Sequence, residues 1–284
     1  MQDSPLYLSD EEVELYARQL VLQGWDEEVQ SNLRSAHIAL IGVGGLGMPV
    51  LSYLAGAGIG HITLIEPDLV DRTNLHRQHM PTLQDVGRSK IDSAKDFIEA
   101  RFAQCKLTCH QTELTDDNAS LLLDGCSMIV DCTDRLETRL MIARLSQARR
   151  IPHIFAGAIR HEGQISVFVP STPDADMSQP DTSGSDKASV THTAHPDNPC
   201  FGCIFPDAPE FAQAPSCAQA GILGPVVGMV GAMQANEVLK LLTGIGTPLI
   251  GKLLLIDAAL PRFDEIKISR QAHCSICGPK NSGG

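Results

Sequence analysis

Residues 36–47 encode a strand, a glycine-rich turn and the start of a helix, and this unit constrains the fold more than any other stretch. Ile38–Ile41 form a short apolar run that is typical of a buried parallel strand. The run ends in Gly42-Val-Gly-Gly-Leu-Gly47, which fits the pattern G-x-G-x-x-G, and apolar residues at helical spacing follow. Such a turn brings backbone N–H groups close to a phosphate at the helix N-terminus, and the expected contacts come from Gly42, Gly44, Gly45 and Gly47.

A second predicted strand, His61–Ile65, ends in Glu66, about twenty residues beyond the glycine turn. An acidic side chain at this place meets ribose hydroxyls in dinucleotide-binding folds. The strand–turn–helix context favours a nucleotide site over a tight turn without a ligand. The motif does not identify the nucleotide, and NAD is one alternative.

Composition and charge narrow the class of protein. The chain has 284 residues, 43% of them apolar, and a net charge of −12. An acidic chain does not favour a nucleic-acid-coating surface. We find no apolar run of membrane-spanning length and no basic-then-apolar leader, so we expect a cytoplasmic protein without nucleic-acid or membrane partners.

Three further groups are expected near the carboxyl ends of the strands, where open α/β sheets bind ligands. Asn74 and Arg77 follow the second strand, and Lys90 lies in the first turn of a predicted helix, where a cation suggests a nearby anion. Asp134 follows the buried run Ser127–Asp131 and could also act as the N-cap of a helix over Leu136–Arg149.

The order of predicted elements indicates an α/β fold: a Rossmann-like sheet that is mostly parallel, helices on both faces, and closing C-terminal antiparallel strands. Residues 171–199 are rich in Ser, Thr, Asp and Pro, which predicts a mobile loop. We therefore expect a single domain over 1–284, with a nucleotide-binding part (1–170), a mobile crossover loop (171–216) and a C-terminal part (217–284) made of an apolar helix, strands and a zinc knuckle.

Four of the nine cysteines form two C-x-x-C pairs: Cys200 with Cys203, and Cys274 with Cys277. Four thiolates make a closed tetrahedral Zn²⁺ site, and we predict one structural zinc that leaves no open position for catalysis. The alternatives are two unrelated reduced pairs or a redox pair. The fold would have to bring the pairs together, because their separation exceeds a zinc-ribbon spacing.

The remaining cysteines fall into two kinds. Cys217 lies alone in a polar stretch just before a glycine and a helix, so an exposed thiol there is a candidate nucleophile. The others lie in or beside predicted strands and are expected to be small core residues: Cys105, Cys109, Cys126 and Cys132.

Taken together, the chain resembles the ThiF/MoeB/HesA adenylyltransferases, bacterial relatives of ubiquitin-activating enzymes. The resemblance covers nearly the whole chain. Besides the glycine turn and both cysteine pairs, it rests on Tyr16-Ala-Arg18-Gln19-Leu, Asn74-Leu-His-Arg77-Gln78, Gly87-Arg-Ser-Lys90, Asp131-Cys-Thr-Asp134, Gly157-Ala-Ile-Arg-His-Glu-Gly163 and the stretch from Cys217 through Gly221-Ile-Leu-Gly-Pro-Val-Val-Gly228.

The resemblance implies ATP as the nucleotide and a ubiquitin-like sulfur-carrier protein ending in Gly-Gly as the partner. The carrier's terminal carboxylate would attack the α-phosphate and give an acyl-adenylate and pyrophosphate, for thiamine or molybdopterin biosynthesis. A cysteine desulfurase or a rhodanese would be the sulfur source.

The resemblance also implies residue roles. Arg77 and Lys90 would bind phosphates, with Asn74 and Gln78 beside them; Glu66 would bind the ribose and Asp134 would hold Mg²⁺. Arg18, which by itself resembles a solvated helix residue, would reach the ATP of the partner subunit in a homodimer. Cys217 matches the reactive cysteine of the family.

The chain departs from the family at two positions, with Glu66 in place of Asp and Arg135 in place of Asn. Three other functions are alternatives: an NAD-dependent dehydrogenase, an ATP-dependent dehydratase acting on tRNA, and a non-catalytic zinc-stapled scaffold that binds a carrier. The dehydrogenase explains the glycine turn but not Arg77, Lys90 and Asp134 together.

Overall fold

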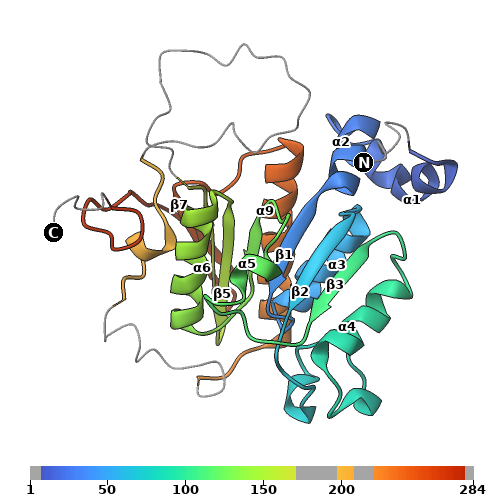
Figure 1. Ribbon diagram of the computed structural model, residues 1–284, viewed down its shortest axis with the longest axis horizontal. Coiled ribbons are helices and arrows are strands. Elements are labelled where there is room, and N and C mark those ends of the chain that lie inside the picture. Colours follow the sequence, from blue (N-terminus) through green and yellow to red (C-terminus); the bar gives the residue numbers. More distant parts are fainter. Residues whose placement is uncertain (1–7, 171–196, 208–219, 279–284) are drawn as a thin grey trace.

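A computed structural model of the protein describes residues 8–170, 197–207 and 220–278. Within these residues, one eight-stranded sheet runs through the molecule and helices cover both of its faces (Figure 1). The N-terminal helices α1 and α2 lie at one end of the sheet's parallel half, and the C-terminal segment lies at the opposite side of the molecule.

The strand order is β3-β2-β1-β4-β5-β6-β7-β8. The first five of these strands pair in parallel, and β6, β7 and β8 join in antiparallel pairing. The bounds are β1 His37–Ile41, β2 His61–Ile65, β3 Lys106–His110, β4 Ile129–Asp131, β5 His153–Ile159, β6 Glu162–Phe168, β7 Lys252–Asp257 and β8 Arg262–Lys267. The predicted α/β sheet with closing antiparallel strands is confirmed.

The helices divide between the two faces. α3, α4 and α9 bury their apolar sides in the larger core cluster, while α5 and α6 pack on the opposite face. The bounds are α1 Asp10–Leu20, α2 Glu27–Ser35, α3 Gly47–Ala57, α4 Lys90–Glu99, α5 Ala119–Leu122, α6 Leu136–Arg149 and α9 Gly224–Thr243, with short 3₁₀ turns η1 Arg72–Asn74, η2 Leu83–Asp85 and η4 Phe201–Cys203. No helix in the described ranges is long and apolar enough to cross a membrane.

Local sequence explains where these helices begin. The Ser9 side chain accepts from the Glu12 backbone N–H, and the Glu12 carboxylate accepts from Ser9, so α1 opens with a capping box. α9 carries a proline in its first turn, where the missing N–H has no intrahelical acceptor in any case. Its apolar sequence fits its place between α3 and the strands β5 and β6.

Two details differ from the sequence prediction. α6 spans the predicted residues, but its N-cap is Arg135 and no side chain caps it, so the N-cap role considered for Asp134 is wrong. The spacing of Val13, Tyr16 and Leu20 predicts a helix over Glu11–Leu22, whereas α1 spans Asp10–Leu20. The Leu22 backbone N–H bonds to the Gln19 carbonyl three residues earlier, so the chain tightens at the end of the helix. The Asp134 carboxylate is consequently not engaged by the helix that follows it.

Candidate functional site

A cavity of about 630 Å³ opens at the carboxyl ends of the parallel strands. The strand order reverses between β1 and β4, and a ligand crevice is expected at that switch point. The segments that follow β1, β2, β3 and β4 each contribute part of the wall, and α9 contributes Val227. The predicted residues at the carboxyl ends therefore come together, although they are spread along the sequence from Gly42 to Asp134.

The glycine turn shows two different uses of glycine. Gly42 has φ +90°, and a Cβ there would lie 2.9 Å from the Cys132 carbonyl oxygen, so the turn itself requires glycine. A Cβ on Gly47 would lie 2.0 Å from the Gly42 oxygen. A Cβ on Gly44, in contrast, would approach only the Gln78 amide, at 3.8 Å. Glycine at position 44 is therefore not needed to avoid a clash within the chain. It leaves room in the cavity, which a ligand that closely approaches the backbone would require.

Glu66 lies at the end of β2 and is almost fully buried. One of its carboxylate oxygens accepts the Val43 N–H at 2.7 Å, and the other accepts the Asp68 N–H at 3.0 Å. The longer glutamate side chain therefore links the second strand to the glycine turn and still lines the cavity. Each oxygen keeps a further lone pair for a ligand hydroxyl.

Lys90 is the first residue of α4, and its side chain is only 7% exposed. Its Nζ lies 2.7 Å from the Asp68 carboxylate and 4.0 Å from Glu66. A buried ammonium requires such partners, because desolvation without them is costly. The neighbouring Arg88 pairs with Asp85 and Asp96 and does not line the cavity.

The segment after β2 brings its polar side chains to the same wall. Arg77 donates to the Thr73 carbonyl at 3.1 Å and lies beside Gly45. Asn74 lines the cavity as well. Gln78 is buried, and its Oε1 has no hydrogen-bond partner among the described residues. An unpaired buried amide oxygen at a cavity wall indicates that a ligand or water completes the site.

The turn after β4 supplies the acidic part of the wall. Asp134 is exposed and makes no hydrogen bond or ion pair with another described residue. Arg135 pairs with Glu113 from the loop after β3, so it does not neutralise Asp134. The carboxylate is therefore free for a cation, as a magnesium ligand must be.

Two sequence-predicted residues are not seen at the cavity. Arg18 lies exposed in the last turn of α1 and is not part of the cavity wall. Cys217 and most of the crossover loop fall outside the described residues. Neither the role across a dimer nor the nucleophile role is tested by this chain alone.

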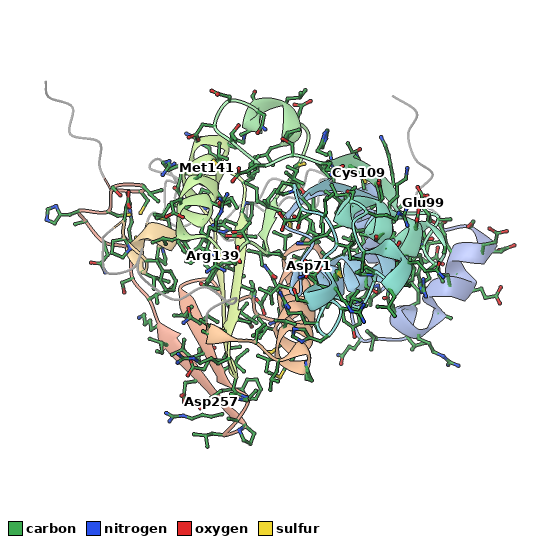
Figure 2. The ribbon with its side chains drawn as sticks, turned by 90° about the horizontal axis from the view of Figure 1, so that it is seen from below. Asp71, Glu99, Cys109, Arg139, Met141 and Asp257 are labelled. Atoms are coloured by element: carbon green, nitrogen blue, oxygen red, sulfur yellow. The ribbon has the colours of Figure 1, made fainter. Side chains whose placement is uncertain are left out.

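Sequence reasoning missed Arg139, which lines the cavity one helical turn after Arg135. Its guanidinium donates to the Thr133 carbonyl and lies 5.0 Å from the ring of Phe155. Arg139 belongs to α6, and Figure 2 labels it toward the middle of the molecule. The sequence signal was its i+4 spacing from a residue at a strand's carboxyl end.

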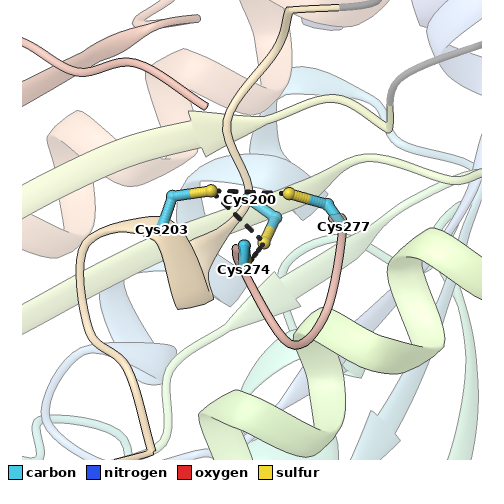
Figure 3. A group of neighbouring side chains, drawn as sticks. All are labelled: Cys200, Cys203, Cys274 and Cys277. Carbon is cyan, nitrogen blue, oxygen red and sulfur yellow. Dashed lines mark hydrogen bonds between the residues drawn. The ribbon is translucent and has the colours of Figure 1, made fainter. Parts of the chain in front are cut away.

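The two cysteine pairs meet at one point (Figure 3). Sγ–Sγ distances are 3.5 Å for Cys200–Cys274, 3.4 Å for Cys203–Cys277 and 3.9 Å for Cys200–Cys203. Four sulfurs at about 2.3 Å from a tetrahedral Zn²⁺ would lie about 3.8 Å apart. A hydrogen bond from Cys200 and a second one from Cys277 lower the pKa of the Cys203 thiol, which favours a thiolate at that position.

This cluster excludes the alternative of two unrelated pairs, and its geometry fits a zinc site. It lies away from the cavity, since none of its cysteines lines that wall. Of the four described cysteines that the sequence places in the core, three are buried as expected, whereas Cys109 is half-buried. Burial raises the pKa of Cys105 to about 12 and that of Cys126 to about 11, so these thiols are not nucleophiles.

Comparison with known proteins gives a consistent result. A sequence model of the ThiF family matches residues 16–276. The molybdopterin-synthase adenylyltransferase of Salmonella typhimurium is 34% identical over 271 residues, which cover 95% of this chain and 98% of the relative. The sulfur carrier protein adenylyltransferase of Thermus thermophilus is 34% identical, over 94% of this chain and 92% of the relative.

Longer relatives match as well. The adenylyltransferase and sulfurtransferase MOCS3 of Culex quinquefasciatus is 33% identical over 97% of this chain, and the chain spans 57% of that relative's length. Among solved structures, E. coli MccB with ATP superposes with a TM-score of 0.74 at 20% identity, covering 93% of this chain and 75% of the other. This last likeness concerns the fold.

Proposed function

This chain belongs to the ThiF family, and from that premise we propose that it activates the C-terminal glycine carboxylate of a ubiquitin-like sulfur-carrier protein with ATP. Its relatives of matching length are adenylyltransferases. The observation that supports the proposal most is the convergence of Gly44, Arg77, Lys90 and Asp134 on one cavity at the switch point. A phosphate chain needs this combination, and a nicotinamide site does not.

The reaction would be a displacement at the α-phosphorus. A carboxylate oxygen of the carrier forms a bond to phosphorus, the bond to the bridging oxygen breaks, and pyrophosphate leaves with the electron pair. No protein base is needed, because the attacking carboxylate is already ionised at neutral pH. Catalysis then consists of positioning the reactants and stabilising charge on the leaving group.

The cavity residues suit these tasks. Backbone N–H groups at the start of α3 would bind phosphate, helped by the absence of any side-chain cap on that helix. Arg77 and Lys90 would stabilise the charge that develops on pyrophosphate, with Lys90 exchanging its Asp68 partner for phosphate. Glu66 would accept from ribose hydroxyls, and Asn74 and Gln78 would complete the polar wall.

A divalent ion fits the acidic part of the site, because the Asp134 carboxylate is exposed and unpaired among the described residues. When bound, Mg²⁺ neutralises and orients the phosphates of ATP. At the cysteine cluster, Cys200, Cys203, Cys274 and Cys277 would hold Zn²⁺ with no open position, so that its contribution is structural.

Two assignments come from the family resemblance. Arg18 would enter the cavity of the partner subunit in a homodimer, in agreement with its absence from the cavity of its own chain. Cys217 would act after adenylation, as a nucleophile toward the activated or sulfur-bearing carrier. The carrier would serve thiamine or molybdopterin synthesis, with sulfur from a cysteine desulfurase or a rhodanese.

The function is tested by ATP–pyrophosphate exchange, with purified carriers of the ThiS and MoaD types added separately. We expect exchange that depends on one carrier and on its terminal glycine, and thermal protection by ATP but not by NAD. Protection by NAD alone would support a dehydrogenase. Carrier binding with no exchange under any condition would support the non-catalytic scaffold.

The role of Cys217 is tested by Cys217→Ser, with Cys109→Ser as the matched control because Cys109 is a half-buried thiol outside both sites. We expect Cys217→Ser to retain ATP–pyrophosphate exchange and to lose sulfur delivery to the carrier. Delivery at the wild-type rate would show that another group is the nucleophile.

A further inference from the structure

A fully buried carboxylate–imidazole pair lies directly behind the cavity. Asp131 is the last residue of β4 and His153 is the first residue of the adjacent strand β5. His153 Nε2 lies 3.0 Å from an Asp131 carboxylate oxygen, and both side chains are 0% exposed. Neither residue lines the cavity, so the proposed chemistry does not use them directly.

The second oxygen of Asp131 holds the turn that carries Asp134. It accepts the Thr133 backbone N–H at 3.0 Å and the Thr133 hydroxyl at 2.7 Å. The Thr133 carbonyl in turn accepts from the Arg139 side chain. Asp131 therefore holds the backbone N–H and the side chain of Thr133, the residue immediately before Asp134, while Arg139 holds its carbonyl.

The imidazole is itself held in place. Its ring centroid lies 5.5 Å from that of Phe168 and 5.9 Å from that of Phe201, the residue after Cys200. Its Nδ1 is buried without a partner among the described residues. Burying an unprotonated ring nitrogen without a partner costs less free energy than burying an unpaired N–H group. We therefore assign the proton to Nε2, which donates to Asp131.

A gain in stability does not explain this buried pair, because burying a charged group seldom adds net stability. Burial acts to raise the pKa of Asp131, but the hydrogen bond from His153, the positive charge of Arg139 and the hydrogen bond from the Thr133 backbone hold that pKa below its usual value. The carboxylate thus stays ionised, which strengthens its hydrogen bonds to Thr133. Ionised acceptors of this kind are suited to fixing a turn in one geometry.

We propose that His153, through Asp131, positions the 132–134 turn so that the Asp134 carboxylate meets the metal–nucleotide complex. The inference rests on the proposed nucleotide site and adds a positioning pair to it. His153 is not a catalytic residue, because it touches neither the cavity nor Asp134.

The test measures the Kd of a non-hydrolysable ATP analogue, with and without Mg²⁺, for the full chain and its variants. We expect His153→Leu to weaken binding about tenfold with Mg²⁺ and less than about threefold without it, since the turn acts on the metal ligand. The double variant His153→Leu/Asp134→Ala should bind no more weakly than Asp134→Ala alone. His153→Gln, which keeps an N–H donor, should recover most of the loss.

Val167→Ala is the matched control for lost core packing, because Val167 is fully buried on the neighbouring strand β6. It belongs to the larger core cluster, not to the cluster that contains Phe168 and Phe201 beside His153. This control should lower the melting temperature without changing the Mg²⁺-dependent part of binding. If His153→Leu does not fold, Thr133→Val carries the test, since it removes one bond to Asp131 from a half-buried position.

The outcomes separate the two levels of the proposal. A wild-type chain that binds no ATP analogue would overturn the proposed function. A wild-type chain that binds it, with additive losses in the double variant or equal losses with and without Mg²⁺, would overturn the positioning role alone. Loss in Val167→Ala equal to that in His153→Leu would also overturn it.

Discussion

At the scale of single residues, Asp134 differs from the other acidic groups of the cavity wall. Glu66 is occupied by two backbone N–H groups, Asp68 by Lys90 and Glu113 by Arg135. Asp134 alone among these carboxylates has no such partner in the described chain. Its substitution therefore removes a candidate metal ligand without leaving a buried charge unpaired.

We expect Asp134→Ala to reduce ATP–pyrophosphate exchange on the order of 100-fold or more, because the proposed metal ligand is lost. The melting temperature should be nearly unchanged, since the Asp134 side chain is exposed and does not cap α6. Glu137→Ala, at an exposed acid on α6 outside the cavity, is the matched control. Exchange at the wild-type rate in millimolar Mg²⁺ would rule out the metal role.

At the scale of elements, the amino ends of β1 and β2 carry two stacked imidazoles. His37 and His61 occupy the same register position, with ring centroids 3.6 Å apart, and each bonds to a threonine hydroxyl, that of Thr63 or of Thr108. Burial, followed by the charges of His37 and Lys106, lowers the pKa of His61 to about 4. Burial also lowers the pKa of His37, so both rings are mainly neutral at pH 7.

Acidification should destabilise the sheet at this end. The unfolded chain takes up a proton on His61 near pH 6.5, whereas the folded chain does so only near pH 4. The contribution of the neutral His61 ring to the free energy of unfolding is complete above pH 6.5. It is lost as the pH falls from 6.5 to 4, because the unfolded state binds more protons than the folded state in that range.

We therefore expect the melting temperature to fall more steeply between pH 7 and pH 5 in the wild-type chain than in His61→Gln, by a few degrees. His161→Gln, at an exposed histidine on the turn between β5 and β6, should retain the wild-type slope. Parallel slopes for all three proteins, measured by calorimetry, would contradict the shifted pKa.

At the scale of the whole molecule, the cysteine cluster joins parts of the chain that are 70 residues apart. We expect about one tightly bound Zn²⁺ per chain by elemental analysis, and a melting temperature several degrees lower after chelation, since metal binding adds to folding free energy. Cys203→Ser should lose the metal, whereas Cys109→Ser should keep it. A metal content near zero in protein never exposed to chelator would contradict this prediction.

Assembly gives a second prediction at this scale. If Arg18 acts across a dimer, an equal mixture of Arg18→Ala and Arg77→Ala chains forms some mixed dimers with one complete site. Random exchange puts about a quarter of all sites in that state, so about a quarter of wild-type pyrophosphate exchange should return.

The control is a mixture of Arg77→Ala with Lys90→Ala. These residues line the same cavity of one chain, so no mixed dimer regains a complete site and activity should stay low. Subunit exchange is checked by mass spectrometry of differently tagged chains. If mixed dimers form and the Arg18→Ala mixture shows no gain in pyrophosphate exchange, the role of Arg18 across the interface is wrong.

The sequence by itself determined the strand–glycine turn–helix unit, the α/β class and the residues at strand ends, because backbone conformation and apolar periodicity are local properties. Gly42 with positive φ and the α1 capping box are examples. It also supplied Lys90, Asp134 and both cysteine pairs as candidates, since each stands at a recognisable position in a motif.

Only the tertiary structure decided which candidates meet. The parallel sheet sets the carboxyl ends of distant strands side by side, and this places Glu66 within reach of Lys90 and brings Asp131 and His153 into one buried pair. It also showed Arg135 paired with Glu113 and Asp134 free of any capping role. Pairing across strands depends on which segments the fold makes neighbours, and no local pattern in the chain encodes that choice.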